Sequence, residues 1–455
     1  MALGHEHGVS HIAEGETTTK EPLDSTLWIH IFLMMLAFGV IFPAGMVLGI
    51  TRNRWHVPVQ TLGSVIAVVA YFLGHAHGGR EFLHNNVHAK FANTLMFLLA
   101  AQVGIGAYLK LHLEKGIHGR IRRIIRPCHG VIGKAMPVVS WVQIIFGGIT
   151  GLGFCQGDHL GQCAAHFIMG SAFVAYGIVL TLLLLVGQLW LRNTNRSQEF
   201  YDSVVIAAWG CVNTFTEHHW GTAWVKNDWQ HTTMGIIWWC AGLAGVWLSR
   251  DGDGNPKRNF IPGFVIFMTG WAMSAHPQEL EVSAMTHSMF GKTLMAAGIT
   301  RIIEVAFVLR DGSGISANGR QHNSFQYIPI FLLYASGFLF MGATEEQMVL
   351  VANSPMDHVS YILILYSFAF LVFLFVHMII ALYERTLKTD GAVAINGSTA
   401  AGGHETRQLR DAEEFELEGL ISDDEDETKR HRRSNDRGPA SPESTLGSNS
   451  DRIAR

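Results

Sequence analysis

Histidine is frequent in this sequence, and four of its 24 histidines open successive apolar runs. These four are His30, His56, His88 and His129. If neighbouring runs cross a bilayer in opposite directions, His30 and His88 share one depth and His56 and His129 share the other. Two imidazoles at one depth suit the axial positions of a six-coordinate haem iron, which transfers electrons and does not bind oxygen. The spacing predicts two such cofactors, one near each membrane face; the alternative is four ordinary interfacial histidines.

Other residues in these runs are compatible with a bound macrocycle. Lys134 follows His129 by five residues and could reach a haem propionate or the lipid headgroups. Small residues allow helices to pack around a wide group in a membrane. The glycines in these runs include Gly39, Gly45, Gly49, Gly104, Gly106, Gly130, Gly133, Gly147 and Gly148.

The composition predicts an all-α integral membrane protein. Hydrophobic residues make up 49% of the 455 residues, and charged residues only 15%. Apolar runs of about 18 residues or more with few charges are typical of transmembrane helices. About eleven such runs occur, at roughly 27–50, 57–74, 89–111, 128–152, 164–191, 201–217, 232–249, 260–275, 283–309, 325–343 and 358–382.

Lysine and arginine are unevenly distributed between the loops that join these runs. The loops after odd-numbered runs are the richer, and the loop after the third, KLHLEKGIHGRIRRIIRP, is the most basic. Because cytosolic loops carry the excess of basic residues, we expect a lumenal or outside N-terminus and a cytosolic C-terminus. These short juxtamembrane clusters do not suggest nucleic-acid binding.

Two of the five cysteines share one short loop, GFCQGDHLGQC. The charge distribution places this loop on the lumenal side, where disulfides persist. We therefore expect a disulfide between Cys155 and Cys163, with two free thiols as the alternative.

The chain divides into five predicted segments. A polar lumenal segment, 1–25, precedes a five-helix bundle over 26–193, and the polar linker 194–200 leads to a six-helix bundle over 201–388. The remainder, 389–455, is rich in Gly and Ser and carries blocks of like charge, which predicts a disordered cytosolic tail.

The first bundle resembles the transmembrane cytochrome b-561 family. The stretch HIFLMMLAFGVIFPAGMVLGITRNRWHVPVQ matches that family's first two core helices, and His88 with Gln102 and His129 with Gln143 resemble the next two. The resemblance covers about 26–192. It implies two haems b, one bound by His30 with His88 and one by His56 with His129. The matched positions of the first two helices are His30, Met34, Gly39, Pro43, Gly45, Arg52, His56 and Gln60.

The whole chain is similar to the fungal YTP family of multi-pass membrane proteins. That family's function is poorly defined, so this second resemblance implies architecture more than mechanism. The histidine spacing and the cytochrome b-561 resemblance predict transmembrane electron transfer from a cytosolic donor to a lumenal acceptor, with ferric ions, cupric ions and monodehydroascorbate as candidate acceptors. Such a protein would be an oxidoreductase in the lipid of a secretory-pathway, vacuolar or plasma membrane. The oligomeric state is left open, with a homodimer among the alternatives.

The second half offers a different chemistry. Five histidines lie in or beside its lumenal turns, near several carboxylates, and mixed imidazole and carboxylate ligands suit zinc, iron, copper or manganese. The alternative is a solvated polar rim. The candidate metal ligands are His218, His219, His231, His276 and His287.

One apolar run of the second half, 283–309, carries Lys292, Arg301 and Glu304. Charge at membrane depth is costly and is expected to be paired. The three residues favour a structural Arg301–Glu304 pair over a proton or ion path. The competing function is therefore a membrane protein without haem, either a metal or proton transporter or a scaffold.

Overall fold

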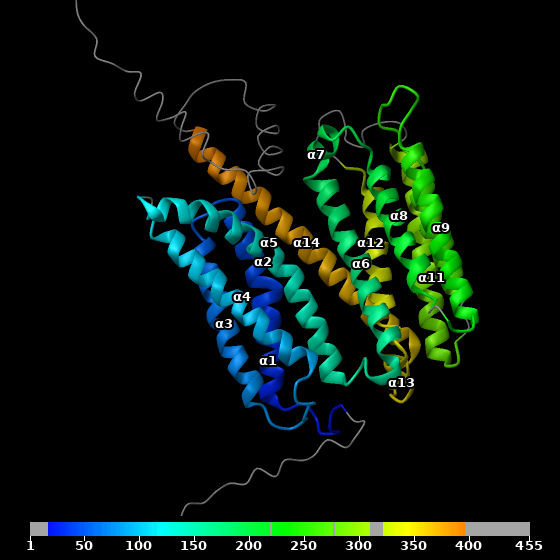
Figure 1. The fold of residues 1–455 in the computed structure, drawn as a ribbon, viewed down its shortest axis with the longest axis horizontal. Helices are drawn as coiled ribbons and strands as arrows, with labels where there is room; N and C mark the ends of the chain where they lie inside the picture. The colour runs from blue at the N-terminus through cyan, green and yellow to red at the C-terminus, as the bar shows by residue number, and fades with distance from the viewer. Residues whose placement is uncertain (1–16, 114, 219–220, 276–277, 310–321, 396–455) are drawn as a thin grey trace, which may run out of the picture.

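The computed structural model describes residues 17–113, 115–218, 221–275, 278–309 and 322–395. Over these ranges the chain forms helices joined by short loops, with three isolated β-bridges (Figure 1). The α-helices are α1 Ser25–Leu36, α2 Phe42–Ile50, α3 His56–Ala76, α4 Val87–Lys110, α5 Ile117–Leu152, α6 Leu160–Leu185, α7 Gln188–Asn193, α8 Gln198–Thr216, α9 Lys226–Leu248, α10 Ile261–Ser274, α11 Glu281–Ile303, α12 Tyr327–Met341, α13 Glu345–Ala352 and α14 His358–Ile395.

The prediction of an all-α membrane protein is confirmed. Seven helices of the described ranges are long and apolar enough to cross a bilayer, whereas the predicted number was about eleven. The four predicted spans absent from these seven correspond to α8–α11, of which α10 is apolar but only 14 residues long. The seven are Ser25–Ile50, His56–Ala76, Val87–Lys110, Ile117–Leu152, Gly157–Leu185, Ser324–Met341 and His358–Leu387.

The first bundle consists of α1–α5. Helix α1 continues into α2 through a π-turn, Ala37–Ile41, which precedes Pro43. A π-turn inserts one extra residue into a helix, and proline lacks the amide that a regular helix would use there. Side chains from all four spans meet in the middle of this bundle. Its buried core is Ala37, Phe38, Phe42, Ala67, Leu95, Leu99 and Met136.

The helix α6 packs in the second bundle and not, as expected from the sequence, in the first. It lies against α12 so closely that a Cβ on Gly170 would stand 2.6 Å from the carbonyl oxygen of Gly337. Its apolar residues enter the core formed by α11, α12 and α14, where Phe290, Tyr334 and Leu339 are buried. The long helix α14 packs against both α2 and α12 and so joins the two bundles.

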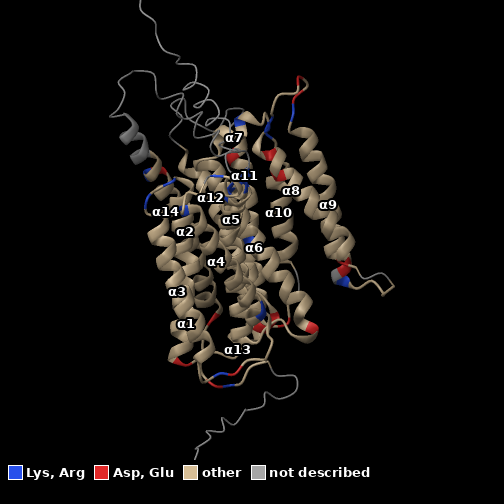
Figure 2. Ribbon diagram, turned by 60° about the vertical axis from the view of Figure 1, so that its left-hand side comes forward, with Lys and Arg blue, Asp and Glu red and all other residues tan. Residues whose placement is uncertain are grey.

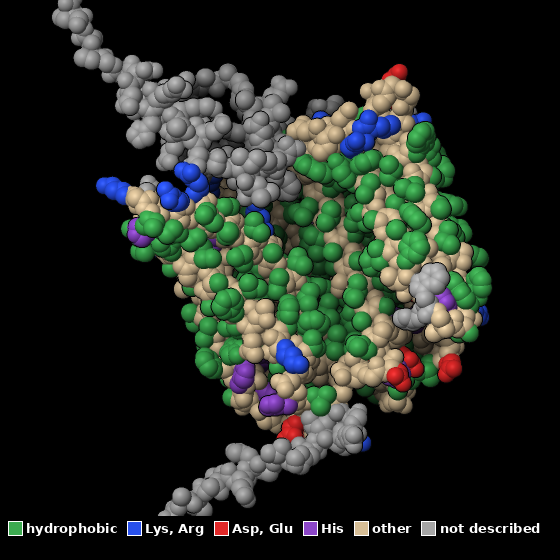
Figure 3. Space-filling view, in the orientation of Figure 1, with side chains coloured by type: hydrophobic (Ala, Val, Ile, Leu, Met, Phe, Trp, Pro, Cys, Tyr) green, Lys and Arg blue, Asp and Glu red, His purple; other side chains and the backbone are tan. Residues whose placement is uncertain are grey.

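The two ends of the molecule differ in charge (Figure 2). We call the end with the loops 51–55, 111–113, 194–197 and 249–260 the basic end, because most Lys and Arg gather there. Between the two ends, hydrophobic side chains cover the visible face in a broad belt (Figure 3). The basic stretch expected as a loop after the third span is largely helical, since α5 begins at Ile117.

The opposite end, which we call the disulfide end, is tied together by local contacts. Cys155 and Cys163 form a disulfide with a Cα–Cα distance of 5.2 Å. The amide of Cys155 donates a 2.9 Å hydrogen bond to Glu346 Oε1 at the start of α13. The disulfide loop is therefore anchored to the second bundle.

Candidate functional site

The four histidines of the first bundle form two pairs. The ring centroids of His30 and His88 lie 6.3 Å apart near the disulfide end, and their planes are 87° apart. Near the basic end, His56 and His129 are 6.4 Å apart with an angle of 86°. All four rings are half-buried. The structure thus brings together the same pairs that the sequence pattern predicts.

Backbone carbonyls of the neighbouring helix orient two of these rings. His30 Nδ1 lies 2.7 Å from the Ala70 carbonyl oxygen on α3, and His56 Nδ1 lies 2.7 Å from the Gly45 carbonyl oxygen on α2. Because a carbonyl can only accept, each Nδ1 carries the proton. In these neutral rings, Nε2 has the lone pair that can bind a metal.

Glutamine side chains lie beside the other two histidines, and the atoms that make contact are their donating amide nitrogens. Gln143 Nε2 lies 2.9 Å from His88 Nδ1 and 3.0 Å from the carbonyl oxygen of the same residue. Gln102 Nε2 donates a 2.9 Å hydrogen bond to the His129 carbonyl oxygen. His129 Nδ1 is buried and has no hydrogen-bond partner among the described residues. The rings of His30, His56 and His88 are therefore each contacted at Nδ1.

Each ring also packs against a glycine of the adjacent helix. A Cβ at that glycine would lie between 2.7 and 3.3 Å from the nearest ring atom, which is closer than an ordinary van der Waals contact. Only hydrogen fits at these positions without movement of the ring. The pairs are His30 with Gly74, His56 with Gly49, His88 with Gly147 and His129 with Gly106.

The histidine and the glycine of each helix belong to different sites. On α3, α4 and α5 the glycine follows the histidine by 18 residues, which is five helical turns, so both project from one face about 27 Å apart. From His30 to Gly49 the interval is 19 residues. The π-turn Ala37–Ile41 lies inside that interval and absorbs the additional residue. This periodicity is visible in the sequence, but the sequence reading did not use it.

The histidine pairs fit haem as a ligand in two respects. With metal–nitrogen bonds of about 2.0–2.1 Å and roughly 1.1 Å from nitrogen to ring centre, two axial imidazoles have centroids about 6.3 Å apart. Both pairs have this separation. Each site offers two imidazole donors, as bis-histidine haem iron requires. Lys134 is exposed on α5.

The histidines predicted as metal ligands in the second half do not converge. His218 Nδ1 lies 3.0 Å from Asp228 Oδ2, and its ring stacks on Trp224. His231 Nδ1 lies 3.2 Å from Glu217 Oε2. His219 and His276 lie outside the described residues. Over the described ranges, no group of three or more His, Cys, Asp or Glu residues could hold a metal ion.

His287 instead pairs with His166 on α6, which the sequence analysis did not select. Their ring centroids are 6.0 Å apart, and each Nδ1 contacts a carbonyl oxygen one turn earlier in its own helix. The ring of His166 stacks on Phe340 at 4.5 Å, so the phenyl group covers one ring face. No local pattern in the sequence indicates this pair, because His166 lies within an apolar run and its partner is distant along the chain.

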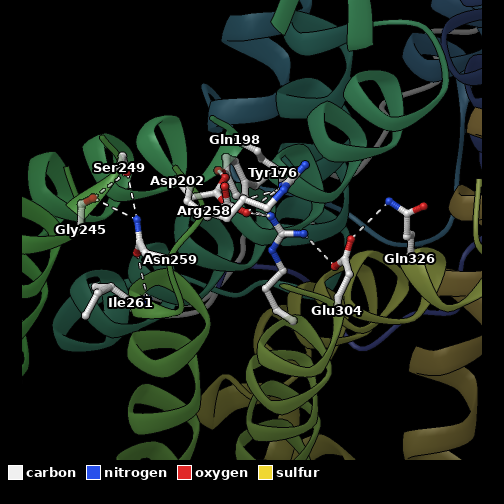
Figure 4. Close-up of polar contacts among 12 residues, drawn as sticks. Tyr176, Gln198, Asp202, Gly245, Ser249, Arg258, Asn259, Ile261, Glu304 and Gln326 are labelled. Atoms are coloured by element: carbon white, nitrogen blue, oxygen red, sulfur yellow. Dashed lines mark hydrogen bonds and ion pairs between the residues drawn. The ribbon is translucent and has the colours of Figure 1, made fainter. Parts of the chain in front are cut away.

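The expected ion pair between Arg301 and Glu304 is present and is part of a larger cluster. Arg301 Nη1 lies 2.7 Å from Glu304 Oε2, and its Nη2 lies 2.7 Å from Glu199 Oε1 on α8 (Figure 4). All three side chains are buried. Lys292 is exposed on α11 and lies outside this cluster.

Comparisons with known proteins identify the family. A family model described as "Protein YTP1-like, C-terminal" matches residues 139–384, and a domain of unknown function matches residues 10–112. Protein YTP1 of Saccharomyces cerevisiae is 43% identical over 293 residues, covering 64% of this chain and 61% of that protein. The chain thus spans less than two thirds of that relative's length.

More distant relatives are membrane proteins as well. An uncharacterized membrane protein of Schizosaccharomyces pombe is 21% identical over 71% of this chain and 87% of its own length. A second uncharacterized membrane protein of Saccharomyces cerevisiae is 24% identical over 45% of this chain and 40% of its own length. With more than half of its residues matched by the YTP1-like model, the chain belongs to the YTP1-like family of multi-pass membrane proteins.

Proposed function

We propose that this protein transfers electrons across its membrane through two haems b held in the first bundle. The observation that supports this most directly is the pairing of His30 with His88 and of His56 with His129 at 6.3 and 6.4 Å. The two pairs share this separation at opposite ends of one bundle, and within the described part of the chain neither has a ring face covered by a stacked phenyl group as His166 does.

Each pair would hold one cofactor through Nε2. At His88 this requires the proton on Nδ1, with the Gln143 amide turned so that Oε1, which has no partner among the described residues, accepts it. Bound between two imidazoles, haem b supplies a one-electron couple with no open coordination position. The carbonyls of Ala70 and Gly45 keep His30 and His56 in the tautomer that such ligation needs. Outer partners of this kind also raise the basicity of the ring and fix its direction.

The core between the two sites keeps water out of the membrane interior. Phe38 and Phe42 lie in edge-to-face contact with centroids 4.9 Å apart, and Leu95, Leu99 and Met136 surround them. This apolar layer separates the two pairs, which the helix repeat places about 27 Å apart along the helices. That interval is close to the roughly 30 Å hydrocarbon thickness of a bilayer, so each pair would lie near one face.

The charge asymmetry assigns a direction to this proposal. The basic end would face the cytosol and the disulfide end the lumen or exterior, in accordance with the positive-inside rule and with the redox conditions that disulfides need. Helices α8–α11 would also cross the membrane, giving eleven spans. The donor would be a cytosolic reductant, and the acceptor a lumenal ferric or cupric ion or monodehydroascorbate.

The test is a reduced-minus-oxidised absorption spectrum of the purified full-length protein. Two b-type signals are expected, and His88→Ala and His129→Ala should each lose one of them, halving the haem content per chain. His75→Ala is the matched control, because His75 is exposed on α3 and its Nδ1 contacts its own helix at the Tyr71 carbonyl oxygen. A monodisperse wild-type protein without b-type signals would eliminate the proposal.

A second function is favoured by the buried ions around Arg301. A metal or proton transporter needs charged groups inside its membrane helices, and such groups are costly unless they are functional or paired. Cells that express Glu304→Gln would then take up less metal than wild type at equal protein level. Unchanged metal uptake would mean that the buried ion pairs around Arg301 have a structural role, as in a scaffold protein.

A further inference from the structure

A cavity of about 470 Å³ lies in the second bundle, between α6 and α8, with α10–α12 behind it. Its volume is in the range of small-molecule sites, about 300–1,000 Å³. Most of its wall is apolar and includes four aromatic rings. Residues that define these walls are Phe173, Tyr176, Trp209, Trp238, Leu294 and Leu333.

One end of the cavity is lined by charged side chains (Figure 4). Asp202 of α8 accepts a hydrogen bond from the Tyr176 hydroxyl, and its Oδ2 lies 3.9 Å from Arg301 Nη2. Arg258 Nη1 and Arg301 Nη2 both contact Glu199 Oε1, at 3.1 and 2.7 Å. These residues come from α6, α8, α11 and the loop before α10, so the cluster exists only when the bundle is assembled.

The cluster has unequal numbers of positive and negative groups. Among the described residues it contains three carboxylates, Glu199, Asp202 and Glu304, and two guanidinium groups, Arg258 and Arg301. With every group ionised, the formal charge is −1. Glu199 Oε2 is buried and has no hydrogen-bond partner over the described ranges. A buried, uncompensated charge is costly, so one added positive charge would stabilise the site.

From this charge and the apolar, aromatic walls, we propose that the cavity binds a lipophilic organic cation of single charge. The cation would place its charge beside Asp202 and Glu304, and its apolar body against Trp209 and Trp238. Aromatic faces attract cations. An anion of the same shape would instead make the formal charge of the site more negative, −2. This site is in the other bundle from the histidine pairs and does not depend on haem.

A proton neutralises the same charge and therefore competes with the cation. The titratable and charged groups around the cavity are Tyr176 on α6, Glu199 and Asp202 on α8, Arg258 before α10, Arg301 on α11 and Glu304 in the π-turn that follows α11. Cation binding then releases a proton, so affinity falls as the pH falls. Proton-coupled exchange of amphiphilic cations would follow from such competition.

The test compares two probe ions of matched shape and opposite charge, tetraphenylphosphonium and tetraphenylborate. Equilibrium dialysis of the purified full-length protein in non-ionic detergent, against protein-free micelles, measures each ion. We expect phosphonium to bind at least tenfold more tightly than borate, and more tightly at pH 8 than at pH 6. Equal binding of the two ions, no binding of phosphonium, or no dependence on pH would overturn the proposal.

Variants locate the bound ion. Asp202→Asn should weaken phosphonium binding at least tenfold, because it removes one negative charge without changing side-chain size. Glu345→Gln is the control, since Glu345 is exposed at the disulfide end, where it contacts His159. If Asp202→Asn does not fold, Glu304→Gln serves in its place. Wild-type affinity in a folded Asp202 or Glu304 variant would refute this location.

Discussion

His88 and Gly147 lie in contact across the α4–α5 interface, where a Cβ on Gly147 would stand 3.2 Å from His88 Cε1. Gly148, the next residue, has nothing within 4 Å of its own Cβ position. The two glycines are adjacent in α5, but only Gly147 packs against a histidine ring.

This difference predicts opposite outcomes for two adjacent substitutions. Gly147→Val would push the His88 ring out of its position, and we expect haem occupancy at the His30–His88 pair to fall by roughly tenfold or more, as for other losses of outer-shell support. Gly148→Val should leave both b-type signals unchanged. Absorption spectra normalised to protein concentration measure this, and equal losses in the two variants would mean that the glycine contact is unimportant.

The two glutamines of the first bundle should differ in their effect on haem binding, because Gln143 contacts a histidine ring and Gln102 contacts only a backbone carbonyl. Gln143→Leu removes the contact at His88 Nδ1, and we expect cofactor affinity at that pair to fall about 10–100-fold. Gln102→Leu removes a hydrogen bond to the His129 carbonyl oxygen only. The ring of His129 keeps its glycine contact, so this variant should retain both signals.

Haem titration into the apoprotein, followed at each b-type band, distinguishes these two variants. A loss of the same size in Gln102→Leu would show that Gln143 acts through the backbone of α4 and not through the His88 ring.

The pairing of the histidines could be predicted from the sequence because that information is periodic. A histidine at the start of each of four alternating apolar runs is sufficient to pair His30 with His88, because antiparallel helices fix the depth of each residue. The glycine repeat was available in the same way but was not used. By contrast, Glu199 meets Arg301 only through packing of α8 against other helices, and local sequence carries no sign of that contact.

The bundle boundary was misplaced for a related reason. An apolar run such as 164–191 indicates a membrane helix but does not specify its neighbours. The close approach of Gly170 to Gly337 places α6 in the second bundle, and these two residues are far apart in the chain. The eleven-span count likewise rests on α8–α11, and α10, although apolar, has only 14 residues.

Asp24 predicts an acid-sensitive contribution to stability at the disulfide end. Its carboxylate accepts hydrogen bonds from the amides of Leu27, at the start of α1, and of Gly78, at 2.8 and 2.9 Å. These amides favour the charged form, so the pKa of Asp24 lies below its ordinary value. The stabilisation is therefore complete above the unfolded pKa of about 3.9 and is lost as the pH falls through the lower folded value.

Asp24→Asn tests this dependence because asparagine can still cap α1 but does not titrate. The Tm advantage of wild type over the variant should be constant above about pH 5, where the unfolded carboxyl is ionised, and should shrink towards pH 3. Thermal unfolding followed by tryptophan fluorescence across this range measures it. Parallel Tm curves would mean that Asp24 contributes through its shape alone.

Two glycine pairs hold α10 and α11 together. A Cβ on Gly291 would lie 2.5 Å from the Gly270 carbonyl oxygen, and a Cβ on Gly298 would lie 2.5 Å from that of Gly263. Each helix carries its glycines seven residues apart, two turns on one face, as an antiparallel small-residue interface requires. The backbones themselves are therefore in contact, and Arg301 reaches Glu199 from the end of this closely packed helix.

Gly291→Ala would force the two helices apart, and overpacking of this kind costs about 1–3 kcal/mol. We expect a lower Tm and, because α11 carries Arg301 and leads directly into Glu304, weaker phosphonium binding in the cavity. Gly161→Ala is the matched control: Gly161 lies in α6 with nothing within 4 Å of its Cβ position, so alanine there should leave Tm unchanged or raise it. If Gly291→Ala unfolds at the wild-type temperature, the α10–α11 interface tolerates a wider spacing than its backbone contacts imply.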